Sequence, residues 1–502
     1  MGIIGRQGFK KTIISYIGVF IGLVSTLYIY PLEEAMYGLA RFLISVSSLL
    51  VPLLSFGTST LVLRFFPVFR DPKSGHHGFL GLLLILSTVF FLIFSVFLVV
   101  WRDLFYQVLR TINLDVEVFS ENLLETGVLV YFLITIGLIT NYISNFQRIV
   151  VPGIFNSLYF KIGLPILILL FYFQLIHEAQ FKWGLIFIHF LILASLVIYT
   201  FFLGEFHLKP DFSFVTKKIA KSMAGYSIHG VFASLGSTIA FKIDAIMTAS
   251  MLGFSSTGIF SIADNVAGVI ASPFLSLRDI SAPIIAQELH DNDLQNIKKL
   301  YTSSSISMLI VGLGMLITAY VSLDFIFQLS AQSSILMQGK MVVLMLGLAK
   351  VIDMTGGVNG LIISFSKLYR WNIVLILLLA VLNIFLNYAL IPIYGINGAA
   401  LASLLSMTIF SVVKMIFVWI RFRLHPFTFQ HLWVVIIAAG AYGLGYIIPH
   451  TGYYLLTFVL KAGITGSIFG GLVLYFKFSP EINAMVLRLY DQAKGFLGMK
   501  RN

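Results

Sequence analysis

Long runs of apolar residues alternate with short polar segments along the whole chain. A helix of about 20 apolar residues crosses the hydrocarbon core of a bilayer, which is about 30 Å thick. The runs are continuous in Leu, Ile, Val and Phe, so they predict helices rather than the alternating strands of a membrane barrel. The pattern predicts fourteen spans: 12–30, 38–62, 78–100, 126–146, 151–173, 183–203, 223–250, 257–277, 302–322, 341–363, 372–392, 398–420, 432–448 and 454–476.

Basic residues are concentrated in alternate gaps between these spans. If the N-terminus is cytoplasmic, 23 of the 33 Lys and Arg residues fall on the cytoplasmic side, 4 in the opposite loops and 6 within spans. Cytoplasmic loops of membrane proteins carry such an excess of Lys and Arg. The pattern therefore predicts a multi-pass membrane protein with both termini in the cytoplasm.

Composition supports the same class. Hydrophobic residues make up 59% of the chain and charged residues 11%, whereas a soluble domain carries about 25% charged residues. The net charge of +12 follows from the basic cytoplasmic segments, which face anionic lipids. We therefore expect membrane lipids as partners and no nucleic acid. The absence of cysteine excludes disulfides and thiolate metal sites.

Motifs for catalysis or nucleotide binding do not occur. The sequence has no P-loop, no HExxH and no GxSxG, each of which would carry a specific chemistry. His76 and His77 lie in a short inner loop, where we expect solvated side chains rather than metal ligands. The longest outer loop, 101–125, is short for the chemistry of a glycan polymerase or ligase. We therefore expect a transporter with no catalytic residue, no metal site, no cofactor and no ATP.

A basic segment divides the predicted helices into six and eight. Six is an even number, so a second six-helix unit begins on the same side of the membrane, as in parallel repeats. Two helix starts, YGLARF from Tyr37 and TGIFSI from Thr257, each have Gly in second position and a Pro about fourteen residues later. This predicts an all-α fold of two six-helix lobes with a pseudo-two-fold axis, plus two C-terminal helices. The expected parts are an N-lobe (1–203), a cytoplasmic linker (204–222), a C-lobe (223–420), and helices 13 and 14 with a tail (421–502).

Charge within the membrane is costly and usually faces a partner or a wet cavity. Lys242, Asp244 and Asp264 share a depth on two consecutive helices, which fits either a cavity lining or a buried ion pair. Lys350 and Asp353 are three residues apart on one helical face, which fits a local ion pair. The candidate coupling or gating residues are Asp244, Asp264 and Asp353.

The remaining intramembrane cations differ in position. Lys161 lies mid-span with no acid in its own helix, which favours cavity lining. Arg41 is near a helix end, where snorkelling to the interface competes with a ligand role. Lys414 is expected to snorkel, and Lys461 lies on a peripheral helix. The spans sum to a net positive charge, which attracts anions, so we predict a lipid-phosphate or diphosphate site formed by Arg41, Lys161, Lys242 and Lys350.

Pairs of asparagines form polar stripes on two spans. Asn141 and Asn145 are four residues apart, as are Asn383 and Asn387, so each pair shares one helical face. Hydrogen bonding between helices and contact with sugars are both compatible with this spacing.

Two segments resemble the bacterial polysaccharide repeat-unit flippases, which export O-antigen, capsule and exopolysaccharide units. In that family an Asp of helix 7 precedes a Gly-[IV]-[YF]-[SG] start to helix 8, and here these are Asp244 and GIFS from Gly258. The stretch LNIFLNYALIPIYGINGAALASLLS from Leu382 is similar to the family's helix 11–12 turn. The resemblance covers essentially the whole chain.

The resemblance implies membership of the MOP superfamily, which includes the MATE transporters, and a place in the bacterial inner membrane. It implies transfer of undecaprenyl-diphosphate-linked oligosaccharide from the cytoplasmic to the periplasmic leaflet by alternating access, with glycan polymerase or assembly proteins as possible partners. Lipid II flippases and ion-coupled MATE exporters remain alternatives. The first carry several Arg residues in helices 1 and 2, where this chain has only Arg41. The second often use a helix 1 acid, which this chain lacks, so H⁺ and Na⁺ both stay open as the coupling ion.

Overall fold

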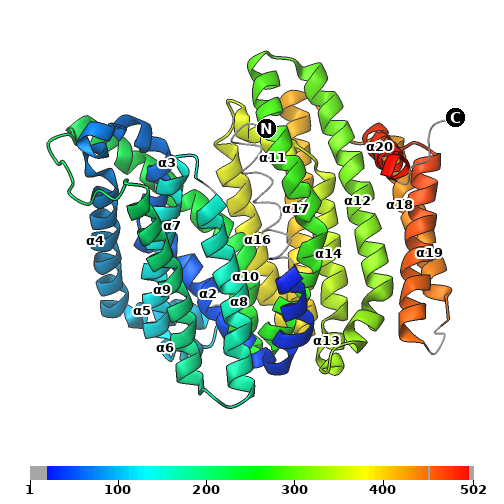
Figure 1. The fold of residues 1–502 in the computed structure, drawn as a ribbon, viewed down its shortest axis with the longest axis horizontal. Helices are drawn as coiled ribbons and strands as arrows, with labels where there is room; N and C mark the ends of the chain where they lie inside the picture. Colours follow the sequence, from blue (N-terminus) through cyan, green and yellow to red (C-terminus); the bar gives the residue numbers. More distant parts are fainter. Residues whose placement is uncertain (1–17, 19, 112–113, 149, 450–452, 497–502) are drawn as a thin grey trace. The chain divides into compact units, whose positions relative to one another are not determined.

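The protein is described by a computed structural model that covers the chain except residues 1–17, 19, 112–113, 149, 450–452 and 497–502. The described residues form helices and no strands (Figure 1). In the first half these are η1 (Ser25–Ile29), η2 (Tyr30–Glu33), α2 (Glu34–Leu54), α3 (Thr58–Phe69), η3 (Pro72–Ser74), η4 (His76–Gly78), α4 (Phe79–Val100), α5 (Arg102–Thr111), α6 (Val116–Ser120), α7 (Leu123–Ser144), α8 (Val150–Tyr172), α9 (Glu178–Phe202) and α10 (Lys217–Gly268).

The second half continues the helical pattern. Its elements are η5 (Val269–Ala271), α11 (Ser272–His290), α12 (Leu294–Gln328), α13 (Ser333–Gln338), α14 (Lys340–Thr355), α15 (Asn359–Phe365), α16 (Trp371–Tyr394), α17 (Ile396–Phe422), α18 (Phe429–Ile447), α19 (Tyr454–Tyr475) and α20 (Pro480–Phe496).

Eleven helical stretches in the described chain are long and apolar enough to cross a membrane, or twelve if the bent pair α14–α15 is one span. The all-helical membrane prediction is therefore confirmed. Two of the stretches, Phe20–Leu54 and Lys217–His290, each cover two predicted spans. Part of the predicted span 12–30 lies outside the described residues. The count of fourteen crossings stays a prediction.

The segments 31–37 and 251–256 fall between predicted spans and were expected to be loops. In the structure both are helical. The first holds Glu, Ala and Met, which are good helix formers, and it forms the 3₁₀ turn η2 and the start of α2. The second lies within α10, which is broken at Gly253 (φ 84°, ψ 173°). Predicted span 38–62 is also interrupted, because α2 ends at Leu54 and Gly57 turns the chain with φ 68° before α3.

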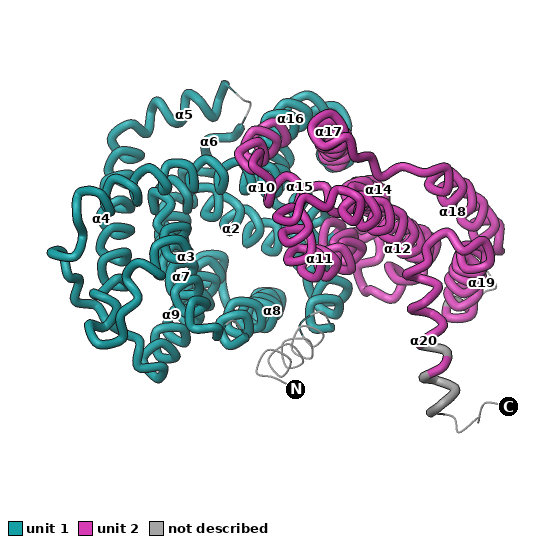
Figure 2. Tube along the Cα trace, turned by 90° about the horizontal axis from the view of Figure 1, so that it is seen from above, with its two compact units in different colours: residues 1–262, 380–399 teal, residues 263–379, 400–502 magenta. Residues whose placement is uncertain are grey.

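The chain packs into two compact units, coloured separately in Figure 2. Unit 1 comprises Met1–Ile262 and Ala380–Ala399, and unit 2 comprises Ala263–Leu379 and Ala400–Asn502. This division differs from the predicted lobes, because most of α10 and the second half of α16 belong to unit 1. The predicted lobe boundaries remain a prediction about the repeat.

Each unit is organised around one helix. In unit 1, α7 packs against α2, α3, α4 and α9, and the core between these helices includes the stacked rings of Phe69 and Phe79, 4.3 Å apart. In unit 2, α12 packs against α14, α18 and α19, around a core that includes Val434 and Phe469.

Candidate functional site

A polar network joins α10 to α16 inside unit 1. The Asn387 amide donates to Asp244 Oδ1 at 2.6 Å and to the Asn383 carbonyl at 2.9 Å. The Asn383 amide donates to the Ala240 carbonyl at 3.2 Å. Both asparagines are buried. Two sets of residues that the sequence treated separately, a candidate coupling acid and a candidate sugar-facing stripe, therefore form one site.

This geometry favours hydrogen bonding between helices as the role of Asn383 and Asn387, because their amides are engaged with α10. It also gives Asp244 a partner on a second helix, which fits a structural role for this carboxylate. Lys242 and Asp244 are two residues apart and so diverge around a helix. No pattern in the sequence links Asp244 to a residue 143 positions away.

The other asparagine pair lies on α7. The Asn141 amide donates to the Ser59 carbonyl at 3.1 Å and so ties α7 to α3. The Asn145 amide donates to the Asn141 carbonyl at 3.0 Å, within its own helix end. These contacts again favour helix packing, and contact with sugars stays a prediction for both residues.

Lys161 lies midway along α8 and is half-buried. Its ammonium lies close to the backbone of Gly18, where an added Cβ would be 3.2 Å from Nζ. No described carboxylate lies within ion-pair distance of it, and the segments outside the described residues contain no Asp or Glu. Arg41 and Lys242 are also half-buried in unit 1 and interact with neighbouring groups.

Ion pairs between helices dominate the polar interior of unit 2. Lys350 Nζ of α14 lies 3.7 Å from Asp264 Oδ1 of α10. Lys414 Nζ of α17 lies 3.5 Å from Asp353 Oδ1 of α14. The expected local pair of Lys350 with Asp353 is therefore replaced by two pairs to other helices. The expectation that Lys414 snorkels is wrong, because its ammonium is engaged with Asp353.

These pairs flank a broken helix. The chain bends by 53° between α14 and α15, where Gly357 has φ 51° and a Cβ would lie 2.6 Å from Ser304 Oγ. Ser305 Oγ donates to the Thr355 carbonyl at 2.6 Å and also lies 3.0 Å from His431 Nε2. Broken membrane helices often form substrate or ion sites in transporters. The Gly356-Gly357 pair was the sequence signal for this break.

Unit 1 contains a reciprocal contact between two glycines. A Cβ on Gly38 would lie 1.8 Å from the Phe254 carbonyl oxygen, and a Cβ on Gly258 would lie 1.9 Å from the Glu34 carbonyl oxygen. The same 220 residues separate Gly38 from Gly258 and Glu34 from Phe254. A two-fold relation between repeats produces such a contact, which is consistent with the predicted repeat.

His76 and His77 join the chain before α4 to the segment before α10. His76 is buried, and its Nε2 lies 2.9 Å from Glu205 Oε2, so the expectation of a solvated side chain is wrong for His76. His77 Nδ1 lies 3.2 Å from Asp211 Oδ2, and its ring stacks on Phe214 with centroids 3.8 Å apart. The pairs hold the start of the apolar stretch His76–Val100 to the segment before α10.

Two carboxylates at this junction have lowered pKa values. Hydrogen bonds from Ser74 and from the Lys73 backbone N–H lower the pKa of Asp71. Hydrogen bonds from Ser213 and His77 lower the pKa of Asp211. Both groups are exposed, so their charge is screened by water.

No protein family model and no curated protein matches the sequence. Solved structures do match the fold. The lipid II flippase MurJ, in an inward closed conformation, has a TM-score of 0.66 and 13% identity over 93% of this chain and 98% of that chain. An inward-facing multidrug resistance MATE family transporter of the MOP superfamily has a TM-score of 0.61 and 13% identity, over 81% and 94%.

A third similar structure is a MOP superfamily transporter from Pyrococcus furiosus whose binding pocket is described as reversed in polarity. It has a TM-score of 0.50 and 14% identity over 84% of this chain and 95% of that chain. At these identities the comparison establishes the fold and not the substrate. The chain is a multi-pass membrane protein with the fold of MOP superfamily transporters and flippases.

Proposed function

We propose that the protein flips undecaprenyl-diphosphate-linked oligosaccharide units from the cytoplasmic to the periplasmic leaflet by alternating access. The fold is shared with a protein described as a lipid II flippase, whose cargo is a lipid-linked molecule. The motifs around Asp244 and after Leu382 direct the proposal to polysaccharide units. No step in this transfer requires a catalytic residue, a metal or ATP.

Lys161 carries the proposal. A lysine in the middle of a membrane helix is costly unless it has a partner or reaches water, and no carboxylate in the described part of the chain pairs with Lys161. An anionic substrate group would supply the missing charge, and a diphosphate is such a group. We assign Lys161 to the diphosphate site, with Arg41 and Lys242 as further cations of the same unit, whereas for Lys350, which is paired with Asp264 in unit 2, a role in anion binding stays a prediction from the sequence.

The ion pairs of unit 2 suit a coupling or gating role. A proton bound by Asp264 or Asp353 would neutralise the carboxylate and release Lys350 or Lys414, whereas Na⁺ would compete with the lysine for the carboxylate. Either event would change the charge beside the break between α14 and α15. This arrangement also favours the second candidate function, an ion-coupled exporter of the MATE type.

The test is a flipping assay with three probes in proteoliposomes. The first probe is a fluorescent undecaprenyl-diphosphate disaccharide, whose exposed fraction is bleached by dithionite. The second is fluorescent lipid II, and the third is ethidium with an imposed proton or sodium gradient. We expect the undecaprenyl-diphosphate disaccharide to be flipped faster than lipid II, and we expect no gradient-driven transport of ethidium. Gradient-driven ethidium transport without lipid flipping would replace the flippase by the exporter, and preference for lipid II would change the cargo.

Variants of Lys161 connect the activity to the site. Lys161→Ala should reduce flipping at least ten-fold, and Lys161→Arg should retain more activity than Lys161→Gln because it keeps the charge. Lys461→Ala is the matched control. Lys461 is another lysine within a predicted span, but it lies on α19, outside the two predicted lobes. Equal activity of the Arg and Gln variants would show that Lys161 acts through hydrogen bonding or packing.

A further inference from the structure

The helix α5 divides into an apolar and a polar half. At 100° per residue, Trp101, Leu104, Phe105, Val108 and Leu109 occupy one continuous side. Arg102, Asp103, Gln107 and Arg110 occupy the other. Such a division predicts a helix that lies in the plane of a membrane interface.

The apolar side of α5 is only partly buried against the rest of the protein. Leu109 is buried, whereas Trp101, Leu104 and Val108 are 52%, 51% and 54% exposed. Spacings of three and four residues place these three side chains in one ridge. Among the described residues, nothing covers this ridge.

The direction of α5 fits a surface position. Figure 2 looks along the helices of unit 1, so that α7 and α9 are seen nearly end-on, whereas α5 is seen side-on at the edge of the unit. The preceding end of α4 exposes Val96, Val99 and Val100 in a helix whose apolar surface is mostly uncovered. The ridge on α5 therefore follows directly on the exposed apolar end of a candidate membrane span. Trp101 stands at the junction, and tryptophan is enriched at membrane interfaces.

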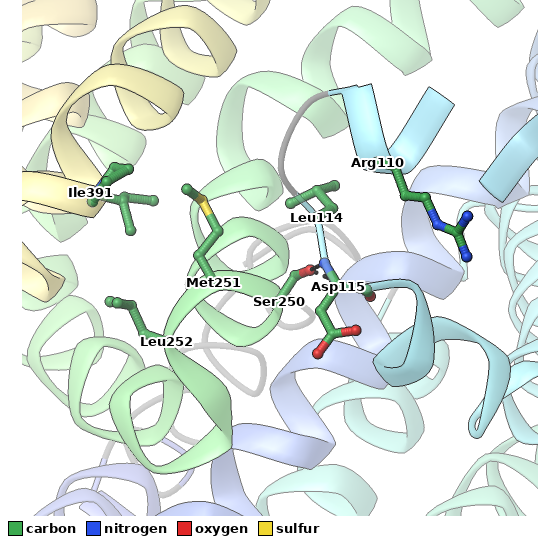
Figure 3. Close-up of a pocket in the computed structure, with 8 residues that line it drawn as sticks. Arg110, Leu114, Asp115, Ser250, Met251, Leu252 and Ile391 are labelled. Carbon is green, nitrogen blue, oxygen red and sulfur yellow. Dashed lines mark hydrogen bonds between the residues drawn. The ribbon is translucent and has the colours of Figure 1, made fainter. Parts of the chain in front are cut away.

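The far end of the segment is fastened to α10. The Asp115 backbone N–H donates to Ser250 Oγ, as Figure 3 shows. The two residues share a groove of about 460 Å³ with Arg110, Met251 and Ile391. Ser250 lies three residues before the break at Gly253. A helix fixed in the lipid surface would thus help to hold Asp115 against α10.

We propose that α5 lies in the lipid–water interface of the outer leaflet, with Trp101, Leu104 and Val108 among the acyl chains and Asp103, Gln107 and Arg110 facing water. The partner is the bilayer surface itself. The proposal does not depend on what the protein transports.

Spin labels on single cysteines test this placement. The native chain has no cysteine, so each variant needs one substitution: Leu104→Cys and Val108→Cys for the ridge, Asp103→Cys and Gln107→Cys for the opposite side. Collision with oxygen reports lipid, and collision with a water-soluble nickel chelate reports water. Val96→Cys on α4 is the lipid reference, and Lys298→Cys on α12 is the water reference.

The ratio of oxygen to nickel collision should be several-fold higher at 104 and 108 than at 103 and 107. Four water-like labels would overturn the proposal, as would labels at 104 and 108 that are shielded from both reagents by a protein partner. An impermeant maleimide added to spheroplasts should label Gln107→Cys from outside. Labelling only after lysis would place α5 on the other leaflet and contradict the proposal.

Discussion

In unit 2, Lys350 and Lys414 each lie within 4 Å of a carboxylate on another helix, whereas in unit 1 no carboxylate of the described residues lies within ion-pair distance of Lys161. The same side chain at membrane depth is therefore neutralised in one unit and left charged in the other. In unit 1 the carboxylate of Asp244 accepts a hydrogen bond from the neutral amide of Asn387.

This difference separates two uses of intramembrane charge. A paired charge belongs to the structure, because removal of one partner leaves the other uncompensated. A charge without a counter-ion costs solvation free energy and returns nothing in packing, so it is explained by a ligand or by water. On the proposed function, the ion pairs of unit 2 would stabilise the fold and allow switching, and Lys161 of unit 1 would attract an anion.

The largest loss of stability is expected when an ion pair of unit 2 is broken. Lys414→Met should lower the free energy of unfolding by about 2–3 kcal/mol, less than for a fully buried pair because both side chains keep some access to solvent. The double variant Lys414→Met with Asp353→Leu should recover to within about 1 kcal/mol of the native protein. Fluorescence of the 5 tryptophans during unfolding in detergent measures both.

Lys461→Met is the control, since this lysine has no carboxylate partner among the described residues. If Lys414→Met and the double variant lose equal stability, the loss is not caused by the broken ion pair. It is then caused by lost packing of the aliphatic part of the Lys414 side chain.

A smaller loss is expected in the amide network of unit 1. Asn387→Leu removes the donor to Asp244 and should lower stability by about 1–2 kcal/mol, the cost of an unsatisfied polar group. Adding Asp244→Leu should restore most of it. Asn145→Leu, whose amide bonds only within its own helix end, should change stability by less than about 0.5 kcal/mol. Equal effects of Asn387→Leu and Asn145→Leu would remove the distinction between the two asparagine pairs.

The positions of the helices were predictable because lipid exposure is a local property. The predicted span 78–100 nearly coincides with α4, Phe79–Val100. Breaks within helices were missed where distant contacts cause them. The break at Gly253 and the helical segment before Gly38 lie beside the reciprocal contact between α2 and α10, which joins segments that are distant in the sequence and which no local pattern contains.

The charged residues of the candidate site could be predicted from the sequence, but the partner of each residue could not. A charged residue within an apolar run is easy to recognise, so Lys161, Lys350 and Asp353 could be found from the sequence. Their partners depend on which helices cross at that depth. Lys350 and Asp353 share a helical face, yet each pairs with a different helix, because interhelical partners lie in reach on both sides of α14.

Lys161 should behave in the opposite way to Lys414. Lys161→Ala leaves no carboxylate uncompensated, so the free energy of unfolding should change by less than about 0.5 kcal/mol or rise slightly. The same unfolding measurement gives this value, and the flipping assay gives the accompanying loss of activity. A loss of stability above 2 kcal/mol would show that Lys161 holds the backbone near Gly18, and the contrast between the units would then fail.

The smallest effect is expected at the junction of unit 1 outside the membrane, where the charges are exposed. The pKa values of Asp71 and Asp211 are lowered in the folded state from an ordinary value of 3.8. Such groups stabilise the fold above that value, and their contribution is lost as the pH falls through the lower folded pKa. Above about pH 5 the unfolding temperature should therefore not depend on them. Between pH 4 and 3 it should fall more steeply in the native protein than in a variant with both Asp71→Asn and Asp211→Asn. Parallel curves for the two proteins would show that the carboxylates contribute nothing to this junction, which would then depend on His76, Glu205 and the stacked ring of Phe214.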